Sequence, residues 1–424
     1  MNKRIPFITF LLLLCLVSAS ALGLQTAALP RAAALPATAL QATAAQATAK
    51  APVTIPFELN GRHIILKGKV NGQPLTFVLD TGDQYAIVDL DLAKRMNLSL
   101  NGEVRVGGAG AAVSSGAFVK DATFTLDGLE GFSQPVKMAL PLGKTLSPRA
   151  GRDFEGIIGE EFIKEFVVEV DYQARLLRLH DKDKFNYSGP GETIPIKLMH
   201  GHPIIDAEVT PLGSNAPLKG KFVLDLGAGL ALALYSPFVA ENKLLGPDAK
   251  TIRSLGGAGA GGETTGRVGR VSDLKIGSYT IKSPITLFSE DKAGAFAMSS
   301  LAGNIGARVA NKFRLFLDYG RSRIIFEPNS TFAAPYDYAQ AGVSVIAEGS
   351  DYRTFRVRAV LENSPASEIG LQKDDVILSV NDQPAAQLTL WKLNEMFEQP
   401  VPYKLTVRRG DQMLSLTLKP RRLV

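Results

Sequence analysis

Two acids stand at equivalent ends of two short apolar segments. Residues 76–83 read TFVLDTGD and residues 221–228 read KFVLDLGA, so Asp80 and Asp225 occupy the same place in a repeated pattern, 145 residues apart. Two carboxyl groups brought face to face cannot both ionise cheaply, and they therefore share one proton. The ionised member can accept a proton from an attacking water while the protonated member hydrogen-bonds a carbonyl oxygen. The pattern thus predicts a two-carboxyl acid/base site.

The repeat extends beyond the two acids. Gly-x-Ile-Gly occurs at 156–159 and 303–306, Thr-Ile-Pro at 54–56 and 193–195, and Gly-Gly-Ala-Gly at 107–110 and 256–259. A further Asp-x-Gly at Asp318 aligns with Asp171, so it belongs to the tail of the repeat. Matched blocks in the same order predict a duplicated lobe. Because one chain already holds both acids, we expect a monomer with pseudo-twofold lobes.

The elements that must position the acids are strands. Short runs rich in β-branched and apolar residues are separated by turn pairs such as Asn60-Gly61, Asn71-Gly72 and Asp127-Gly128, which is typical of all-β domains. We expect lobe 1 over residues 53–183 and lobe 2 over residues 193–329. One helix is predicted in lobe 1, capped by Asp89 or Asp91 and ending near Asn97. The glycine runs at 107–110 and 256–262 fit either mobile hairpins or slack exposed loops.

The segment Phe-Val-Leu-Asp-Thr-Gly resembles the active-site motif of the pepsin and retropepsin aspartic proteases. The resemblance implies an all-β fold with two retropepsin-like lobes and hydrolysis of peptide bonds in a polypeptide substrate by Asp80, Asp225 and a bound water, with no cofactor and no metal. In that family the apolar-Ile-Gly block packs beside the acid-bearing loop. The residues that would support the acid loops are Thr81, Gly82, Gly227, Gly159 and Gly306.

Two positions depart from that motif. Leu226 stands where the family has the second of two threonines that brace the acid loops, and Asp83 adds a third carboxyl where Ser, Thr or Ala is usual. If Asp83 points inward it raises the proton affinity of the site, and if it points outward it is a turn residue. An alternative function is therefore a catalytically inactive, peptide-binding homologue, and a third is an interaction protein in which the cleft is unused.

The tail from 335 to 424 differs in kind from the lobes. Residues 364–371 (SPASEIGL) and 373–381 (KDDVILSVN) resemble a PDZ domain, although Asp374 replaces the usual glycine. The resemblance implies an α+β domain that adds an extended peptide to a sheet edge and captures the peptide C-terminus. Residues 341–344 are the nearest candidate for the carboxylate-binding loop. The alternative is that this domain only packs against the lobes.

The N-terminal residues carry a targeting pattern. Residues 1–21 combine Lys3 and Arg4, an apolar run and the small-x-small site Ala19-Ser20-Ala21, which predicts a signal peptide and a secreted or periplasmic location. The run is too short to span a membrane, and we expect no stable membrane anchor. Cys15, the only cysteine, lies inside it. Residues 22–52 are rich in Ala and Thr and are predicted to be a disordered spacer.

Charge and histidine content exclude two other kinds of site. The net charge of +6 is modest for 424 residues, and the arginine pairs at 408–409 and 421–422 are not interleaved with aromatic residues, so no nucleic-acid binding is expected. His200 and His202 alternate on a predicted strand, but no third ligand is evident and we expect no metal site.

Overall fold

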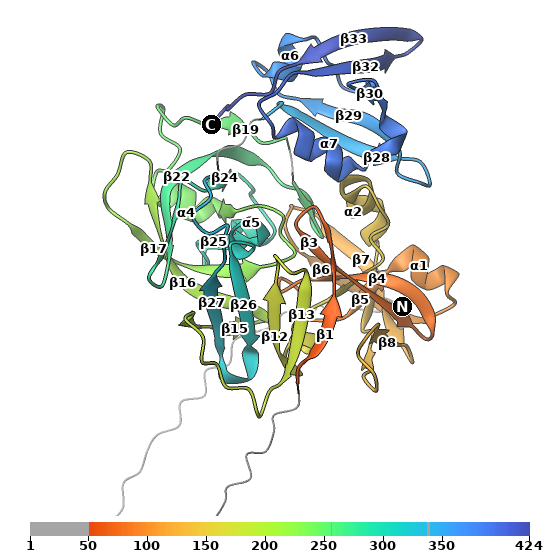
Figure 1. Cartoon of the computed structure of the whole chain (residues 1–424), viewed down its shortest axis with the longest axis vertical. Helices are drawn as coiled ribbons and strands as arrows, with labels where there is room; N and C mark the ends of the chain where they lie inside the picture. The colour runs from red at the N-terminus through yellow and green to blue at the C-terminus, as the bar shows by residue number, and fades with distance from the viewer. Residues whose placement is uncertain (1–50, 256, 337–339) are drawn as a thin grey trace, which may run out of the picture. The chain divides into compact units, whose positions relative to one another are not determined.

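The computed structural model describes residues 51–255, 257–336 and 340–424. The predicted signal peptide and all but the last two residues of the predicted spacer lie outside the described residues. The described chain consists mainly of strands, as Figure 1 shows, which confirms the all-β prediction for the lobes.

A six-stranded sheet connects the two lobes. Its order is β1 (Val53–Pro56), β13 (Leu176–Asp181), β12 (Phe166–Asp171), β26 (Phe313–Asp318), β27 (Arg323–Pro328) and β14 (Glu192–Pro195), so each predicted lobe contributes three strands. The central pair, β12 and β26, is antiparallel and places Val168 opposite Leu317 and Val170 opposite Leu315. All four of these side chains are fully buried, so apolar packing joins the lobes here as well as the ladder of hydrogen bonds.

Each lobe also has a sheet of its own, and the acid-bearing strand lies inside it. In lobe 1 the order along the sheet is β6 (Ser99–Gly107), β7 (Val113–Lys120), β10 (Met138–Leu140), β5 (Ile87–Asp89), β11 (Gly156–Ile158), β4 (Gln73–Leu79), β3 (His63–Val70), β8 (Thr123–Leu126) and β9 (Gln134–Pro135), with β2 (Glu58–Asn60) paired to β3. β4 and β11 are parallel. Because β4 is flanked by β3 and β11, Asp80 leaves it from the interior of the sheet.

The sheet of lobe 2 has a corresponding arrangement. Its order is β15 (Lys197–Met199), β16 (His202–Pro211), β17 (Leu218–Asp225), β25 (Gly303–Gly306), β18 (Leu232–Leu234), β24 (Ile285–Ser289), β22 (Gly266–Ile276) and β19 (Ile252–Arg253), with β23 (Tyr279–Lys282) paired to β22. The strands β20 (Ala258–Gly259) and β21 (Gly262–Glu263) form a separate hairpin. β17 and β25 are parallel, as β4 and β11 are in lobe 1.

The helices are short, and lobe 1 has more of them than the sequence pattern indicates. α1 (Leu90–Arg95) begins after Asp89, whose Oδ1 accepts a hydrogen bond of 2.9 Å from the Leu92 N–H, so Asp89 and not Asp91 is the cap. The predicted helix is therefore present, and lobe 1 has two further helices that the sequence did not indicate. α2 (Leu142–Ala150) was missed because Pro148 lies inside the helix and breaks the usual signal, and α3 (Glu160–Ile163) is a single turn.

The remaining helices fill connections. In lobe 2 these are α4 (Ser236–Glu241) and α5 (Ala307–Ala310), together with the 3₁₀ turns η1 (Ala295–Ala297) and η2 (Tyr319–Arg321). α5 directly follows β25, just as α3 follows β11 in lobe 1, so the repeat extends to these single-turn helices.

The C-terminal region has a sheet and a hydrophobic core separate from those of the lobes. The sheet order is β28 (Val343–Glu348), β29 (Thr354–Val360), β30 (Val376–Val380), β32 (Tyr403–Arg409) and β33 (Gln412–Leu418), with β31 (Gln383–Pro384) on β30, and α6 (Pro365–Glu368), η3 (Ala385–Gln387) and α7 (Leu390–Phe397) complete it. Asp374 has φ +71°, a left-handed conformation that glycine adopts most easily. This explains why the PDZ pattern usually has glycine there.

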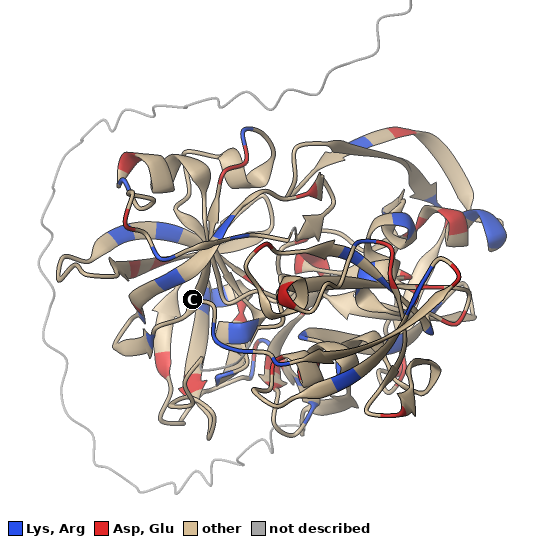
Figure 2. Cartoon of the chain, turned by 90° about the horizontal axis from the view of Figure 1, so that it is seen from above, with Lys and Arg blue, Asp and Glu red and all other residues tan. Residues whose placement is uncertain are grey.

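Charged residues of both signs are interspersed over the strands (Figure 2). In the C-terminal region Arg409 Nη2 lies 2.7 Å from Asp375 Oδ2 and Arg421 Nη2 lies 2.6 Å from Glu368 Oε1. Each of the two arginine pairs, 408–409 and 421–422, therefore has a member bound to an acid.

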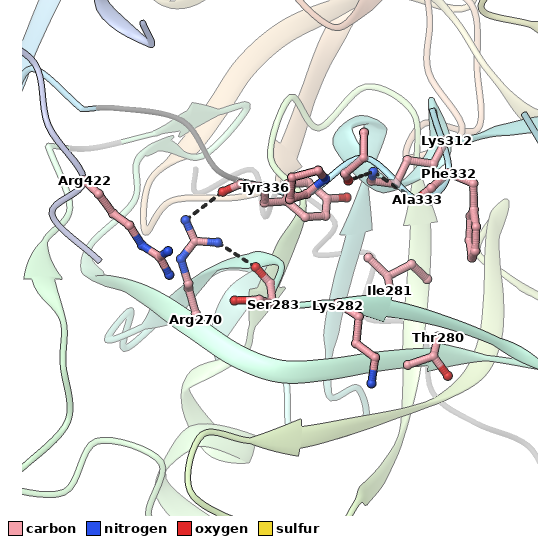
Figure 3. Close-up of a pocket in the computed structure, with 12 residues that line it drawn as sticks. Arg270, Thr280, Ile281, Lys282, Ser283, Lys312, Phe332, Ala333, Tyr336 and Arg422 are labelled. Atoms are coloured by element: carbon pink, nitrogen blue, oxygen red, sulfur yellow. Dashed lines mark hydrogen bonds between the residues drawn. The ribbon is translucent and has the colours of Figure 1, made fainter. Parts of the chain in front are cut away.

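Two cations hold the segment that leads from lobe 2 into the C-terminal region. Lys312 is 6% exposed and its Nζ donates to the carbonyls of Thr331, Phe332 and Ala334. Arg270 Nη2 donates to the Tyr336 carbonyl at 2.7 Å. Lys312, Arg270 and Tyr336 line a pocket of about 410 Å³ (Figure 3). Because its polar groups bond mainly to backbone carbonyls, this pocket anchors the connecting segment.

We expect Lys312→Met to lower the free energy of unfolding by about 2 kcal/mol, because three carbonyls lose a charged donor and no other side chain replaces it. Urea unfolding of the variant measures the effect. Lys219→Met is the matched control, since 84% of the Lys219 side chain is exposed. Equal unfolding midpoints for the two variants would show that the three Lys312 bonds contribute nothing.

Candidate active site

Strand pairing determines where each acid emerges. β4 pairs with β11 through Leu79 opposite Ile158, and the Asp80 N–H continues the ladder with a bond of 2.9 Å to the Ile158 carbonyl. The chain then turns, and the Gly82 N–H donates to Asp80 Oδ1 at 2.7 Å. In lobe 2 the Ala228 N–H donates to Asp225 Oδ1 at 2.9 Å. Each carboxyl is thus oriented by a backbone N–H of its own loop.

The two loops bring Asp80 and Asp225 together. A Cβ placed on Gly82 would lie 2.8 Å from Asp225 Oδ1, and one placed on Gly227 would lie 2.0 Å from Asp80 Oδ2. The two carboxyl groups hydrogen-bond each other. Each acid therefore rests on the glycine of the opposite loop, and a side chain at either glycine would occupy the place of a carboxyl oxygen.

Burial and mutual repulsion favour the protonated form of part of this cluster. Burial raises the pKa of Asp225 well above its ordinary value, and the charge and hydrogen bond of Asp80 raise it further. The pKa of Asp83 is also raised well above its ordinary value, first by burial and then by the charges of Asp80 and Asp225. The half-buried Asp83 carboxyl therefore lies within reach of the charges of both acids, which favours the inward orientation over the outward one.

Only one half of the threonine brace is present. Thr81 is fully buried, its Oγ1 donates to the Leu224 carbonyl at 2.6 Å, and the same oxygen accepts from the Leu226 N–H at 2.9 Å. The side chain of Leu226 is fully buried in the main hydrophobic core. Thr81 thus ties the lobe 1 loop to the backbone of lobe 2, while Leu226 contributes apolar packing in place of a second hydroxyl.

Glycines 159 and 306 allow a second close approach in each lobe. A Cβ on Gly159 would lie 2.0 Å from the Asp83 carbonyl oxygen, and one on Gly306 would lie 2.4 Å from the Leu230 carbonyl oxygen. The block that follows β11 or β25 therefore passes directly against the backbone of the acid loop. The geometry agrees with the supporting role expected for both glycines.

The sequence did not single out Asn304, which contacts an acid directly. Its Nδ2 donates to Asp225 Oδ2 at 2.8 Å, and its Oδ1 accepts from the hydroxyl of buried Tyr235 at 2.5 Å. The repeat places Ile157 at the corresponding position of lobe 1, so only Asp225 has such a donor. The sequence signal that could have identified Asn304 is that it is the one polar residue in the block 303–306, which otherwise consists of glycine and isoleucine.

The two glycine runs form hairpin tips that bind each other. The Gly261 N–H donates to the Ala109 carbonyl at 2.9 Å, and the Ala112 N–H donates back to the Gly261 carbonyl at 2.8 Å. A Cβ on Gly110 would lie 2.3 Å from the Gly261 carbonyl oxygen. Glycine lets the two tips meet, so these runs are joined hairpins and not slack loops.

The histidine pair considered as metal ligands is split between two environments. His200 is exposed, whereas His202 is partly buried and forms a hydrogen bond with the Thr81 backbone. Within residues 51–255, 257–336 and 340–424 no group of three or more His, Cys, Asp or Glu side chains is placed to hold a metal ion.

Comparison with known proteins assigns two parts of the chain. Residues 66–162 match the family model of an aspartyl protease, and residues 356–408 match that of a PDZ domain. These two segments of the chain are similar to an aspartyl protease and to a PDZ domain, respectively. The first match begins in β3 and ends in α3, so it includes Asp80 and Gly159 and lies within lobe 1.

Individual relatives resemble limited parts of the chain. A protein of Treponema pallidum (strain Nichols) named "Putative zinc metalloprotease" is 30% identical over 151 residues, which cover 30% of this chain and 33% of that protein. The chain thus spans a third of the length of this curated relative. The aspartic proteinase of Irpex lacteus has a TM-score of 0.43 and 13% identity over 66% of this chain and 98% of its own. The HtrA3 PDZ domain with a phage-derived ligand has a TM-score of 0.18 and 26% identity over 20% of this chain and 85% of its own.

The PDZ domain packs against lobe 1. β28 is an edge strand with α7 beside it, and α2 of lobe 1 contacts both elements. The Tyr352 hydroxyl donates to Asp153 Oδ1 at 2.8 Å. Gly342, in the candidate carboxylate-binding loop before β28, has φ +73°. The packing contact is therefore present, and peptide binding at β28 stays a prediction.

The hairpin β20–β21 forms ion pairs with both sides of the contact between lobe 1 and the PDZ domain. Glu263 Oε1 lies 2.6 Å from Arg149 Nη2 on α2 and 3.1 Å from Arg358 Nη1 on β29. One carboxylate of the second glycine-rich hairpin thus binds an arginine from lobe 1 and one from the PDZ domain.

We expect Asp83→Asn to raise the melting temperature at pH 7. The pKa of Asp83 is higher in the folded protein than in the unfolded chain, where it is near 4. As pH rises above 4, the unfolded chain releases this proton first, so the free energy of unfolding falls until the folded pKa is passed. The gain should therefore shrink as pH falls toward 4. Scanning calorimetry between pH 4 and 8 measures it, with the exposed Asp127→Asn as control. A gain that grows toward acid pH would contradict the repulsion.

We expect Leu226→Thr to lower the melting temperature and to bring no gain in activity. Leu226 packs in an apolar core, where a buried hydroxyl without a partner costs about 1–3 kcal/mol, whereas a buried hydrogen bond contributes only about 1 kcal/mol. Melting temperature and cleavage rate are measured together on this variant. A protein both more stable and more active than the wild type would show that the second half of the brace can be restored.

Proposed function

We propose that this protein is an aspartic-type endopeptidase in which Asp80 and Asp225 activate a water molecule. The observation that supports this most directly is that two repeat-equivalent acids from two lobes meet, each against the glycine of the opposite loop. The match of residues 66–162 to an aspartyl protease family supports the same chemistry. Their catalytic roles are the proposal.

The proposed reaction uses one shared proton. Asp225, whose pKa is raised and which hydrogen-bonds Asp80, is assigned as the protonated member that donates to the oxygen of the scissile carbonyl. Asp80 accepts a proton from the attacking water, whose oxygen bonds to the carbonyl carbon. Collapse of the tetrahedral intermediate breaks the C–N bond, and the proton held by Asp80 passes to the leaving amine nitrogen. A hydroxyl of the intermediate returns its proton to Asp225 as the carboxyl product forms. The pair then returns to its single shared proton.

We further propose that the enzyme acts as a monomer that is secreted or periplasmic. Both acids belong to one chain, and the antiparallel pair β12–β26 joins the lobes, so a partner subunit is not needed to complete the dyad. The location is supported by the signal-peptide pattern of residues 1–21. In the described part of the chain, no helix has the length and apolar character to cross a membrane.

The PDZ domain is proposed to bind the C-terminus of a polypeptide through β28. An edge strand offers unpaired backbone groups to which an extended peptide can be added. Because α2 already contacts β28 and α7, the peptide must either share this edge with α2 or displace it. Such a domain would raise the effective concentration of a tethered substrate at the acid pair.

A catalytically inactive peptide-binding protein is the second candidate. The observation that favours it is Asp83, since a third carboxyl in the cluster increases its proton affinity and Leu226 removes one hydroxyl from the brace. In this case the cleft would hold an extended peptide without cleaving it.

The test is proteolysis of an unfolded protein mixture between acid and neutral pH, with and without a transition-state inhibitor of aspartic proteases. We expect inhibitor-sensitive cleavage by the wild type and a loss of at least about a thousandfold in both Asp80→Asn and Asp225→Asn, because either change removes one of two groups that act as a unit. Asp206→Asn, an exposed acid on β16, is the matched control.

The outcomes separate the two candidates. Retention of near wild-type rate by Asp225→Asn would show that Asp225 is not the partner of Asp80. Absence of cleavage by the wild type at every pH, combined with binding of an extended peptide, would favour the inactive homologue.

A further inference from the structure

Two histidines occupy equivalent positions in the duplicated lobes. His63 lies nine residues after Thr54, and His202 lies nine residues after Thr193, the threonines that begin the two Thr-Ile-Pro blocks. Each histidine is also the first residue of a strand, β3 in lobe 1 and β16 in lobe 2. The sequence pattern drew attention to His200 and His202, whereas the repeat pairs His202 with His63.

Both rings reach across to the acid loop of the opposite lobe. His63 Nε2 lies 3.0 Å from the carbonyl oxygen of Gly227, in the loop that carries Asp225. His202 forms a hydrogen bond with the backbone of Thr81, in the loop that carries Asp80. Because the buried Nδ1 of His202 has no partner, this bond is made by Nε2, the same atom that His63 uses. The two histidines are repeat-equivalent, and each contacts the acid loop of the opposite lobe, although Gly227 corresponds to Gly82 and not to Thr81 in the repeat.

The surroundings of the rings favour the neutral form. Burial lowers the pKa of His63 and of His202, and the charge of Asp80 opposes this effect in both. The His63 ring also packs edge-on against Phe154, with ring centroids 6.2 Å apart. A neutral imidazole whose Nε2 carries the proton is a single donor, which is what a loop carbonyl requires.

The histidine contacts complement the incomplete threonine brace. Thr81 holds the Leu224 carbonyl and the Leu226 N–H, but the lobe 2 loop has no hydroxyl to return these bonds because Leu226 is apolar. His63 and His202 add one cross-lobe contact in each direction, to Gly227 and Thr81, the loop residues next to or near the acids. Both loops are thereby tied to the lobe opposite their own.

We propose that His63 and His202 are positioning residues that hold the two acid loops at the separation at which Asp80 and Asp225 share a proton. The proposal rests on the peptidase function proposed above. Neither ring takes part in the bond changes, and each acts through the loop carbonyl that it binds. From the starts of β3 and β16, the pair adds to the half of the brace that Thr81 supplies.

The test exploits where amide side chains place their N–H groups. Gln carries its amide at the distance of His Nε2 and can still reach the carbonyl, whereas Asn ends at the distance of Nδ1 and cannot. Steady-state kinetics on an unfolded protein substrate are measured for Gln and Asn variants of His63 and His202, with melting temperatures in parallel. His200→Asn, an exposed histidine in the same turn as His202, is the matched control.

We expect His63→Asn and His202→Asn to lower kcat by about ten- to a hundredfold with KM changed less than about twofold, because a small displacement of catalytic groups reduces the rate and leaves substrate binding largely intact. The Gln variants should retain kcat within about threefold, and His200→Asn should equal the wild type. Equal kcat for the Gln and Asn variants at either position would overturn the proposal, as would a change confined to KM.

Failure of the peptidase function can be distinguished from failure of this inference. If the wild type cleaves nothing, the hydrogen bonds of His63 and His202 are measured by NMR of the protein with ¹⁵N-labelled histidine. Slow solvent exchange of the Nε2–H of His63 and His202 and fast exchange of that of His200 would support the contacts without any activity. Fast exchange at all three rings would overturn them.

Discussion

Two carboxyl groups that share a proton attract each other, and the same groups repel when both ionise, so the chemistry of this protein depends on holding Asp80 and Asp225 in contact. The contact is possible because Gly82 and Gly227 have no side chains where the opposite carboxyl lies. It is maintained because the lobes are joined through β12 and β26, which keeps each acid loop opposite the other. The close packing of each acid against the glycine of the opposite loop is thus the constraint that the surrounding residues must satisfy.

The pseudo-symmetry of the lobes is broken at the places where the acids need different environments. Asn304 donates to Asp225, and the corresponding residue in lobe 1 is apolar. Asp83 stands in the lobe 1 loop, and the corresponding residue of lobe 2 is Ala228. Identical environments would leave the shared proton equally distributed, whereas a donor on one side and a carboxyl on the other distinguish the two acids. A duplicated chain can evolve such differences because each copy mutates independently, which a dimer of identical subunits cannot do.

The PDZ domain is connected to the protease domain through contacts that also involve the glycine-rich hairpins. α2 of lobe 1 contacts β28, and its Arg149 binds Glu263 together with Arg358 of the PDZ domain. Exposed ion pairs of this kind contribute little stability individually. Their effect here is on position, because they hold the PDZ domain and the lobe 2 hairpin β20–β21 next to α2.

The sequence by itself determined the features that depend on local pattern and on the repeat. The equivalence of Asp80 and Asp225, the strand that precedes each, the positions of Gly159 and Gly306 and the PDZ-like tail are all legible because neighbouring residues and matched blocks encode them. The structure brings the two acids together as the repeat requires, and their catalytic role stays a prediction.

Only the tertiary structure decided which side chains join the acids. Asp83 lies within reach of the charges of both acids, Asn304 reaches Asp225, and His63 and His202 cross to the opposite loops, although residues as far apart as 63 and 227 share no local signal. α2 was missed for a related reason. Its interior proline argues against a helix in the sequence, whereas in the structure the helix forms and packs against β28 and α7. Contacts between distant segments depend on how the lobes pack, and one sequence read locally contains no measure of that packing.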